Sequence, residues 1–406
     1  MLFSIGLILI LGFIGGYLAS KIRVPGLVMM IIVGLIIGPY ALNLLDQSLL
    51  DISSYLRQIA LVIILTRSGL NLDFSSLKKM GRPALLMSFI PATFEIMGVT
   101  LASYYFLGLT IFEGMLLGSV LAAVSPAVVS PRMIHLIEKG YGKPNEVPKL
   151  ILAGASLDDI YVIVLFYGFL GLVETNTFNP LSLLEIPISI GLGILLGLIV
   201  GFILGFILKR TKFKATINLI IVLGVSLLLV GLETIVAPYI SISSLLSVIV
   251  LSMVILLTNQ TKAKELAKGY NGLWQVFEIL LFVLVGASLD LSYALLNIGP
   301  SLLVLLIGLL FRSIGVILSI SFTRYSFKEK VFTMIAYLPK ATVQASIGAI
   351  ALNLGLGAGS IILAVAVLSI LVTAPLGAFL IDLLAPKLLK KKEEEIIPSN
   401  SLPQES

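Results

Sequence analysis

The chain alternates between long apolar stretches and short polar connections over almost its whole length. Each apolar stretch is near or above the ~20 residues that a helix needs to cross the hydrocarbon core of a bilayer. These stretches lie at residues 2–20, 26–44, 54–71, 84–107, 112–135, 150–173, 183–208, 216–237, 241–258, 272–290, 296–323, 331–356 and 359–385. The pattern predicts an all-α membrane protein with about thirteen transmembrane helices.

Basic residues are distributed unevenly between the connections. Of the 27 lysines and arginines, 23 lie after odd-numbered stretches or in the short polar tail at 387–406, whereas connections after even-numbered stretches carry acids such as Asp46 and Glu113. Because basic connections stay in the cytoplasm, we expect a multi-pass protein of the cell (inner) membrane, with the N-terminus outside and the C-terminus cytoplasmic. No basic region precedes the first stretch, so we interpret it as a retained helix and not a signal peptide.

Composition narrows the classes of function. Hydrophobic residues make up 58% of the chain and charged residues 12%, which lies outside the range of soluble domains. The sequence has no cysteine and a single histidine, His135, so neither a thiolate metal site nor a multi-histidine centre can be proposed. No nucleophile elbow or phosphate-binding loop favours a membrane enzyme. We expect the lipid bilayer, and no nucleic acid, as a partner.

Two similar segments each end an apolar stretch. Leu65–Asp73 ends the third stretch and Leu284–Ser292 ends the tenth, each as an apolar run with a glycine, a leucine and an acid. If stretches 1–6 and 8–13 are repeats and the seventh is a linker, seven helices separate equivalent positions, so the two halves have opposite orientations. Inverted repeats are typical of secondary transporters, whose site lies near the membrane midplane.

Prolines and polar residues interrupt the fifth and twelfth stretches. The fifth contains SPAVVSP and the twelfth PKATVQ, and the residues expected at the breaks are Ser125, Pro126, Pro131, Pro339, Thr342 and Gln344. Proline removes a backbone donor, and lipid cannot satisfy the freed carbonyls, so a break needs protein or a water-filled cavity beside it. A simple proline kink is the alternative. Lys340 is placed to compensate the negative C-terminal ends of broken helices.

Among the ionisable residues inside apolar stretches are Glu95, Asp158, Asp159 and Arg312. A carboxylate at the bilayer centre costs several kcal/mol and two adjacent ones repel, which indicates a site that exchanges protons for cations. A buried guanidinium needs an anion, and we expect Glu95 to pair with Arg312, which leaves both aspartates free. Arg57 and Arg67 lie near the ends of the third stretch, where we expect them to reach the interfaces.

These strings and buried charges resemble the cation:proton antiporter superfamily. GASLDD, SPAVVSP and PKATVQASIGA, with Glu95 and Arg312, are most similar to animal NHA sodium/hydrogen antiporters and their bacterial relatives, over essentially the whole chain. The resemblance implies an NhaA-type fold with two inverted six-helix repeats, crossed discontinuous helices 5 and 12, and a homodimer. Its expected parts are dimerisation-type helices at 1–83 and 216–295, core helices at 84–175 and 296–386, and a linker helix at 176–215.

The resemblance also implies an elevator-like exchange of Na⁺ or Li⁺ for H⁺, without a cofactor. The matching residues are the ion-binding aspartates Asp158 and Asp159, the buried pair Glu95 and Arg312, and Lys340 in the second broken helix. By charge, ionised aspartates bind the cation, helped by an oxygen of the first break such as Ser130, and protons displace it. We expect Asp159 to be the primary ligand, because Asp158 points about 100° away around the helix.

The sequence does not exclude other transporters on the same fold. A K⁺/H⁺ antiporter and an organic-anion symporter are the alternatives, since Na⁺, Li⁺ and K⁺ all take oxygen ligands. A cation channel would need repeated acids or carbonyl rings around a symmetric axis, so a single acid pair beside broken helices favours a carrier. Some electrogenic relatives carry a lysine where this chain has Arg312. An arginine keeps its proton, and we therefore expect electroneutral exchange.

Overall fold

The computed structural model describes the chain except for residues 23, 73, 143–144, 176–179, 212, 237–238, 241 and 392–406. In the described ranges the regular secondary structure is helical, and these ranges contain no strand. The helices are α1 (Leu2–Lys21), α2 (Gly26–Ile37), α3 (Gln47–Asp51), α4 (Ser53–Leu70), α5 (Phe74–Met80), α6 (Arg82–Phe106), α7 (Ile111–Leu121), α8 (Pro126–Glu138), α9 (Val147–Thr175), α10 (Pro180–Arg210), α11 (Ala215–Val236), α12 (Ser244–Thr258), α13 (Gln260–Ala287), α14 (Leu291–Leu296), α15 (Ile298–Ser319), α16 (Phe327–Ala336), α17 (Thr342–Ile347), α18 (Ile350–Asn353) and α19 (Gly359–Leu388).

Helix is found at each of the apolar stretches. Among the described residues, nine helical segments are long and apolar enough to cross a bilayer, and α2 and α12 are shorter apolar helices. The stretch at 26–44 is helical only to Ile37, because Gly38 and Pro39 follow and a helix usually ends before a proline. The tenth stretch starts earlier than expected. Its helix α13 begins at Gln260, where the Asn259 side chain accepts a hydrogen bond from the N–H of Lys262.

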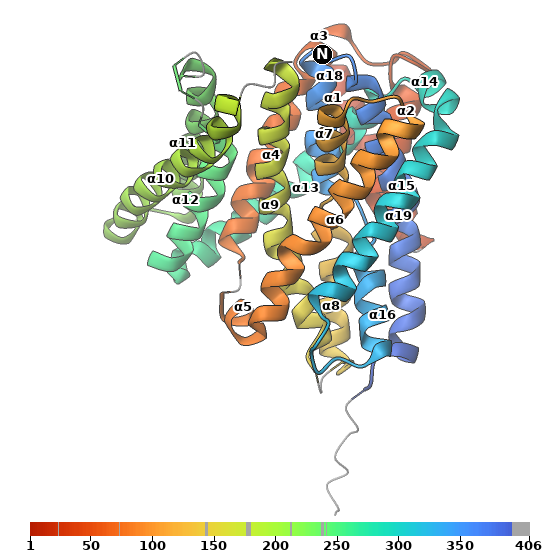
Figure 1. Cartoon of the computed structure of the whole chain (residues 1–406). Coiled ribbons are helices and arrows are strands. Elements are labelled where there is room, and N and C mark those ends of the chain that lie inside the picture. The colour runs from red at the N-terminus through yellow and green to blue at the C-terminus, as the bar shows by residue number, and fades with distance from the viewer. Residues whose placement is uncertain are drawn as a thin grey trace, which may run out of the picture.

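Two groups of helices lie towards opposite edges of the molecule. Figure 1 shows α10, α11 and α12 together at one edge of the molecule, with α15, α16 and α19 towards the other. α10 packs along α12 and α6 packs along α15. α13 packs against both α2 and α4, so a later helix of the chain contacts the N-terminal helices.

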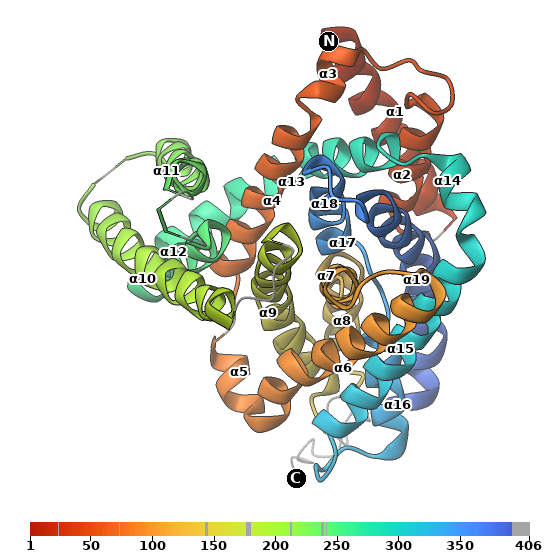
Figure 2. The same cartoon turned by 45° about the horizontal axis from the view of Figure 1, so that its top comes forward.

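The short helices of the interrupted stretches lie inside this arrangement. Figure 2 shows α7, α8, α9 and α17 in the middle of the molecule, with α4 and α13 on one side and α6, α15 and α19 on the other. α7 and α8 both pack against α9, and α17 contacts α4 and α13. The polar residues of the fifth, sixth and twelfth stretches are therefore brought together in the interior.

Close approach of backbones decides how α10 packs on α12. An added Cβ at Gly197 would lie 2.6 Å from the carbonyl oxygen of Ser247, and one at Gly201 would lie 2.8 Å from Cβ of Val254. Small residues at intervals of four place such contacts on one face of a helix, as in other membrane helix pairs. The α10–α12 contact thus depends on residues without side chains.

Candidate functional site

The two interrupted helices meet at their non-helical breaks. Residues 122–125 separate α7 from α8, and residues 337–341 separate α16 from α17. The N–H of Ser125 donates to the carbonyl of Pro339 at 2.8 Å. Pro126 occupies the first position of α8, where a helix needs no donor and the fixed φ of proline is favourable. Each break therefore satisfies part of the backbone of the other.

Besides Pro126, three further residues expected at the breaks lie within helices. Pro131 is in the interior of α8, and Thr342 and Gln344 are in the first turn of α17. A proline at 131 leaves the carbonyl of Ala127 without its helical donor. Ala127 lines the cavity described below, where water replaces the missing donor more readily than lipid does. α8 therefore continues through Pro131.

Gln344 satisfies the backbone of both breaks with one side chain. Its amide nitrogen donates to the carbonyl of Leu121 at 3.2 Å and to that of Ala123 at 2.9 Å. Its amide oxygen accepts from the N–H of Ala341 at 2.8 Å. All three backbone groups lie at helix ends, which lack partners within their own helix.

Arg312 of α15 compensates the C-terminal ends of both broken helices. Its guanidinium donates to the carbonyl of Ala122, at the end of α7, and through Nε to the carbonyl of Tyr337, at the end of α16, at 2.7 Å. A cation at these ends is favourable because the last carbonyls carry partial negative charge. The sequence led us to expect this role for Lys340. The ammonium of Lys340 instead contacts Glu95.

Four charged side chains form one buried cluster. Glu95 Oε2 accepts from Arg312 at 2.8 Å and from Lys340 at 2.6 Å, and Arg312 also contacts Asp158 Oδ2 at 3.0 Å. The N–H of Val124, in the first break, donates to the same oxygen of Asp158 at 2.7 Å. All four charged residues are fully buried. Their formal charges cancel, which is the condition for holding ions away from water.

The two aspartates differ in their surroundings. Asp158 is tied to Arg312 and to the first break, so the expectation that both aspartates stay free is wrong for this residue. Asp159 forms no ion pair among the described residues, and its Oδ1 has no hydrogen-bond partner there. Consecutive residues of a helix point about 100° apart, so α9 presents Asp158 to the cluster and Asp159 to a different direction.

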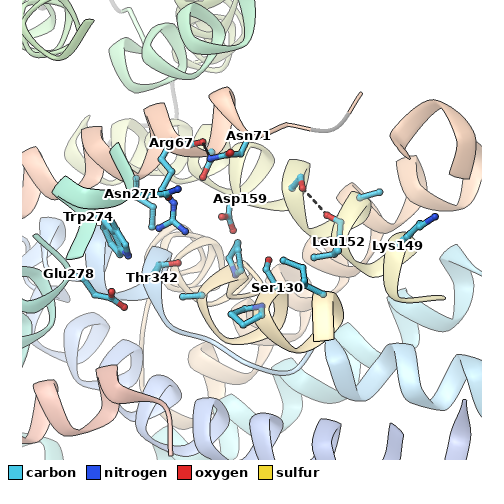
Figure 3. A pocket seen from close by; sticks show the side chains of 18 of the residues that line it. Arg67, Asn71, Ser130, Lys149, Leu152, Asp159, Asn271, Trp274, Glu278 and Thr342 are labelled. Atoms are coloured by element: carbon cyan, nitrogen blue, oxygen red, sulfur yellow. Dashed lines mark hydrogen bonds between the residues drawn. The ribbon is translucent and has the colours of Figure 1, made fainter. Parts of the chain in front are cut away.

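A cavity of about 680 Å³ reaches Asp159. Ser130 of α8 and Thr342 of α17 line it, and Figure 3 shows Asp159 projecting among these two side chains and Arg67. Oγ1 of Thr342 has no hydrogen-bond partner among the described residues. Asp158 does not line the cavity. One carboxylate, with hydroxyl oxygens nearby, is thus accessible to small solutes, and these are the ligands that hard cations prefer.

Arg57 and Arg67 do not lie where the sequence led us to expect. Arg57 is 3% exposed and donates to Ser288 Oγ at 2.6 Å and to Asn353 Oδ1 at 3.0 Å. Arg67 lines the cavity, with its guanidinium carbon 5.9 Å from the centre of the Trp274 ring. Neither side chain extends to the membrane surface, because α13 packs against α4. Arg57 therefore faces protein, and Arg67 faces the cavity.

Three cavity residues on α13 were not predicted from the sequence. Asn271, Trp274 and Glu278 line the cavity opposite α8. Glu278 had a usable signal, because an acid inside an apolar stretch is a candidate functional residue in a membrane protein. Asn271 and Trp274 had none, because neither is unusual near the end of a membrane helix.

The fold and the site are those of a membrane transporter. Apolar helices, two of them interrupted at a shared point beside buried carboxylates, are typical of secondary transporters. The chain matches the family model described as "Sodium/hydrogen exchanger, transmembrane" over residues 7–385. It belongs to this family.

Individual relatives agree with the family. The chain is 34% identical to human sodium/hydrogen exchanger 9B2 over 420 aligned residues, which cover 97% of this chain and 76% of the relative. It is 36% identical to mouse sodium/hydrogen exchanger 9B1 over 356 residues, covering 84% and 62% of the two chains. The solved structure of the sodium proton antiporter MjNhaP1 from Methanocaldococcus jannaschii superposes with a TM-score of 0.81 at 25% identity, covering 95% of this chain and 97% of that one. The homologues are transporters, not enzymes.

Proposed function

We propose that this protein exchanges Na⁺ or Li⁺ for H⁺ across the cell (inner) membrane, with Asp159 as the group that binds either the cation or the proton. The observation that carries the proposal is the asymmetry of the aspartates. Asp159 lines the cavity, whereas Asp158 is held by Arg312 in the neutral cluster. Competition of a cation and a proton for one carboxylate couples their movements without a separate gate.

The oxygen atoms around Asp159 support a small dehydrated cation as the cargo. Ser130 and Thr342 line the same cavity from the two broken helices. Hydroxyl and carboxylate oxygens replace part of the hydration shell of an alkali ion. Asp158 serves the site indirectly, since it fixes the first break through the N–H of Val124.

An elevator-like motion fits the way the helices are divided. In this proposal the core helices at 84–175 and 296–386 move against the helices at 1–83 and 216–295, which form a homodimer. The helix at 176–215 links the two parts. Thirteen spans, with the N-terminus outside, then form two inverted repeats in which the interrupted helices cross. The packing supports this: α6 lies on α15 and α4 on α13, which are pairs that the repeat equates.

The stoichiometry follows from which groups are free to release a proton. Arg312 keeps its proton at any relevant pH, and it holds Asp158 as an ion pair. Asp159 is then the remaining carboxylate of the pair, which gives one proton for one cation. Exchange of equal charges does not respond to the membrane potential.

Purified protein in proteoliposomes containing a pH-sensitive dye tests the proposal. Adding Na⁺ or Li⁺ should dissipate an imposed pH gradient in the wild type and not in Asp159→Asn. The matched control is Asp51→Asn, the same change at an exposed carboxylate, which should behave as the wild type. Near-normal exchange by Asp159→Asn would remove Asp159 from the mechanism, and a response to K⁺ alone would reassign the cargo. Na⁺ uptake that follows a potassium–valinomycin potential would contradict one-for-one exchange.

A further inference from the structure

The cavity that reaches Asp159 has a positive charge at one end. Lys149, in the first turn of α9, lines it, and Figure 3 shows Lys149 at the end away from Trp274 and Glu278. Its side chain is 39% exposed, so this end opens towards solvent. Ten residues of helix, about 15 Å, separate Lys149 from Asp159. An unpaired ammonium here would repel a cation approaching the site.

Glu146 lies directly before this helix and contacts two lysines with one oxygen. Its Oε1 is 2.7 Å from the ammonium of Lys149 and 3.0 Å from that of Lys79. These hydrogen bonds lower the pKa of the Glu146 carboxyl. A carboxyl with a lowered pKa takes up a proton only when the pH falls below its usual acidic range, so Glu146 stays ionised wherever exchange is measured.

The backbone around Glu146 is held in an unusual conformation. Its φ is 54°, in the left-handed region that residues other than glycine rarely adopt. The neighbouring Asn145 donates to both carboxylate oxygens of Glu329, each at 3.0 Å, and so fastens this loop to the first turn of α16. Exposed ion pairs add little to stability. A contribution to stability therefore does not explain why the ion pair lies at the open end of the cavity.

We propose that Glu146 determines cation access to the site, by neutralising Lys149 at the open end of the cavity and Lys79, which contacts the same carboxylate oxygen. The proposal rests on the function proposed above. With Glu146 ionised, the three side chains carry one net positive charge, and without it they carry two. Charges at the opening of a cleft change the local concentration of a charged substrate by tenfold or more. Glu146 therefore acts on the apparent affinity for the cation and not on the rate of the exchange step.

Glu146→Gln isolates this effect, because it removes the charge and keeps the shape. In proteoliposomes at about 20 mM ionic strength, its KM for Na⁺ should rise roughly three- to tenfold, with the maximal rate within about twofold of the wild type. In about 0.5 M choline chloride the difference should shrink to below about twofold, because salt screens charges over distances longer than a few ångströms.

A matched control and a rescue variant complete the test. Glu265 pairs with Lys262 three residues apart, at 3.0 Å, and neither lines the cavity. Glu265→Gln removes the same charge and should leave KM unchanged. Glu146→Gln with Lys149→Gln should return KM to within about twofold of the wild type, because the second change removes the uncompensated ammonium.

Several results would overturn the proposal. They are an unchanged KM in Glu146→Gln, a rise that persists in high salt, an equal rise in Glu265→Gln, and a failure of Lys149→Gln to rescue. A rise that persists in high salt would report damage to the loop. If the wild type and Glu265→Gln exchange cations and Glu146→Gln matches them, only this inference fails. If the wild type moves no protons on adding Na⁺ or Li⁺, the proposed function fails and this inference with it.

Discussion

Replacing Glu95 should lower the free energy of unfolding strongly. Replacing Lys340 as well should restore most of it. Glu95 Oε2 holds both Arg312 and Lys340, at 2.8 and 2.6 Å. In Glu95→Leu, Arg312 keeps its contact with Asp158. Lys340 keeps none, because no other acid among the described residues lies within ion-pair distance of it. A fully buried ammonium is then left without an anion.

The size of the loss follows from that uncompensated charge. Breaking a buried ion pair by removing one partner costs about 3–5 kcal/mol. Replacing both partners with apolar residues of similar volume is often close to neutral. Glu95→Leu with Lys340→Met leaves Arg312 and Asp158 as a balanced pair, so most of the free energy of unfolding should return.

The prediction depends on which cation, Lys340 or Arg312, is replaced together with Glu95. Glu95→Leu with Arg312→Met should recover less, because it separates Asp158 from its cation. It also strips the donors from the carbonyls of Ala122 and Tyr337. Unfolding in mixed detergent micelles, followed by the fluorescence of the single tryptophan, measures each free energy. If Glu95→Leu with Lys340→Met lost the sum of the two single changes, the two residues would not act as partners.

Two further predictions use the same unfolding measurement. Gln344→Leu leaves the carbonyls of Leu121 and Ala123 and one N–H without their side-chain partner. It should cost about 1–3 kcal/mol for each group left unsatisfied, and an unchanged stability would show that water or the backbone replaces the amide. Gly197→Ala should weaken the contact of α10 with α12, since the new Cβ would lie 2.6 Å from a carbonyl oxygen, whereas Gly191→Ala on the same helix meets nothing within 4 Å. Equal effects of the two alanines would contradict the packing argument, because helix propensity favours both.

The positions of the helices could be predicted because they follow from hydropathy and proline chemistry. Apolar runs of membrane length and the break before Pro126 need only the local sequence. The ends of α2 and α13 were missed. Gly38 ends α2 earlier than a hydropathy average suggests, and a cap at Asn259 starts α13 within a charged segment. Such signals concern single residues, which an average over a window does not resolve.

The contact partners of the charged residues come from segments far apart in the chain. Arg57 donates hydrogen bonds to Ser288 and Asn353, which are more than 200 residues away in the sequence. Hydropathy alone predicted that Arg57 would lie at the membrane surface. The contact of Glu95 with Arg312 was expected from the repeat. The additional contacts of Arg312 with Asp158 and with two carbonyls were not, because they depend on how the breaks pack. Local sequence thus indicates which charges are buried better than it indicates their partners.

The neighbouring aspartates show how one helix separates two tasks. α9 contributes to both the neutral cluster and the cavity, because a turn of about 100° between consecutive residues directs Asp158 to the first and Asp159 to the second. Asp158 supports the first break, through Arg312 and the N–H of Val124. Asp159 keeps an oxygen without a partner among the described residues. Because the charges of the cluster balance without Asp159, the proton or cation that we propose for Asp159 would change the charge facing the cavity and leave the packing of the breaks intact. That separation is what a carrier needs if its moving part is to stay folded while its cargo changes.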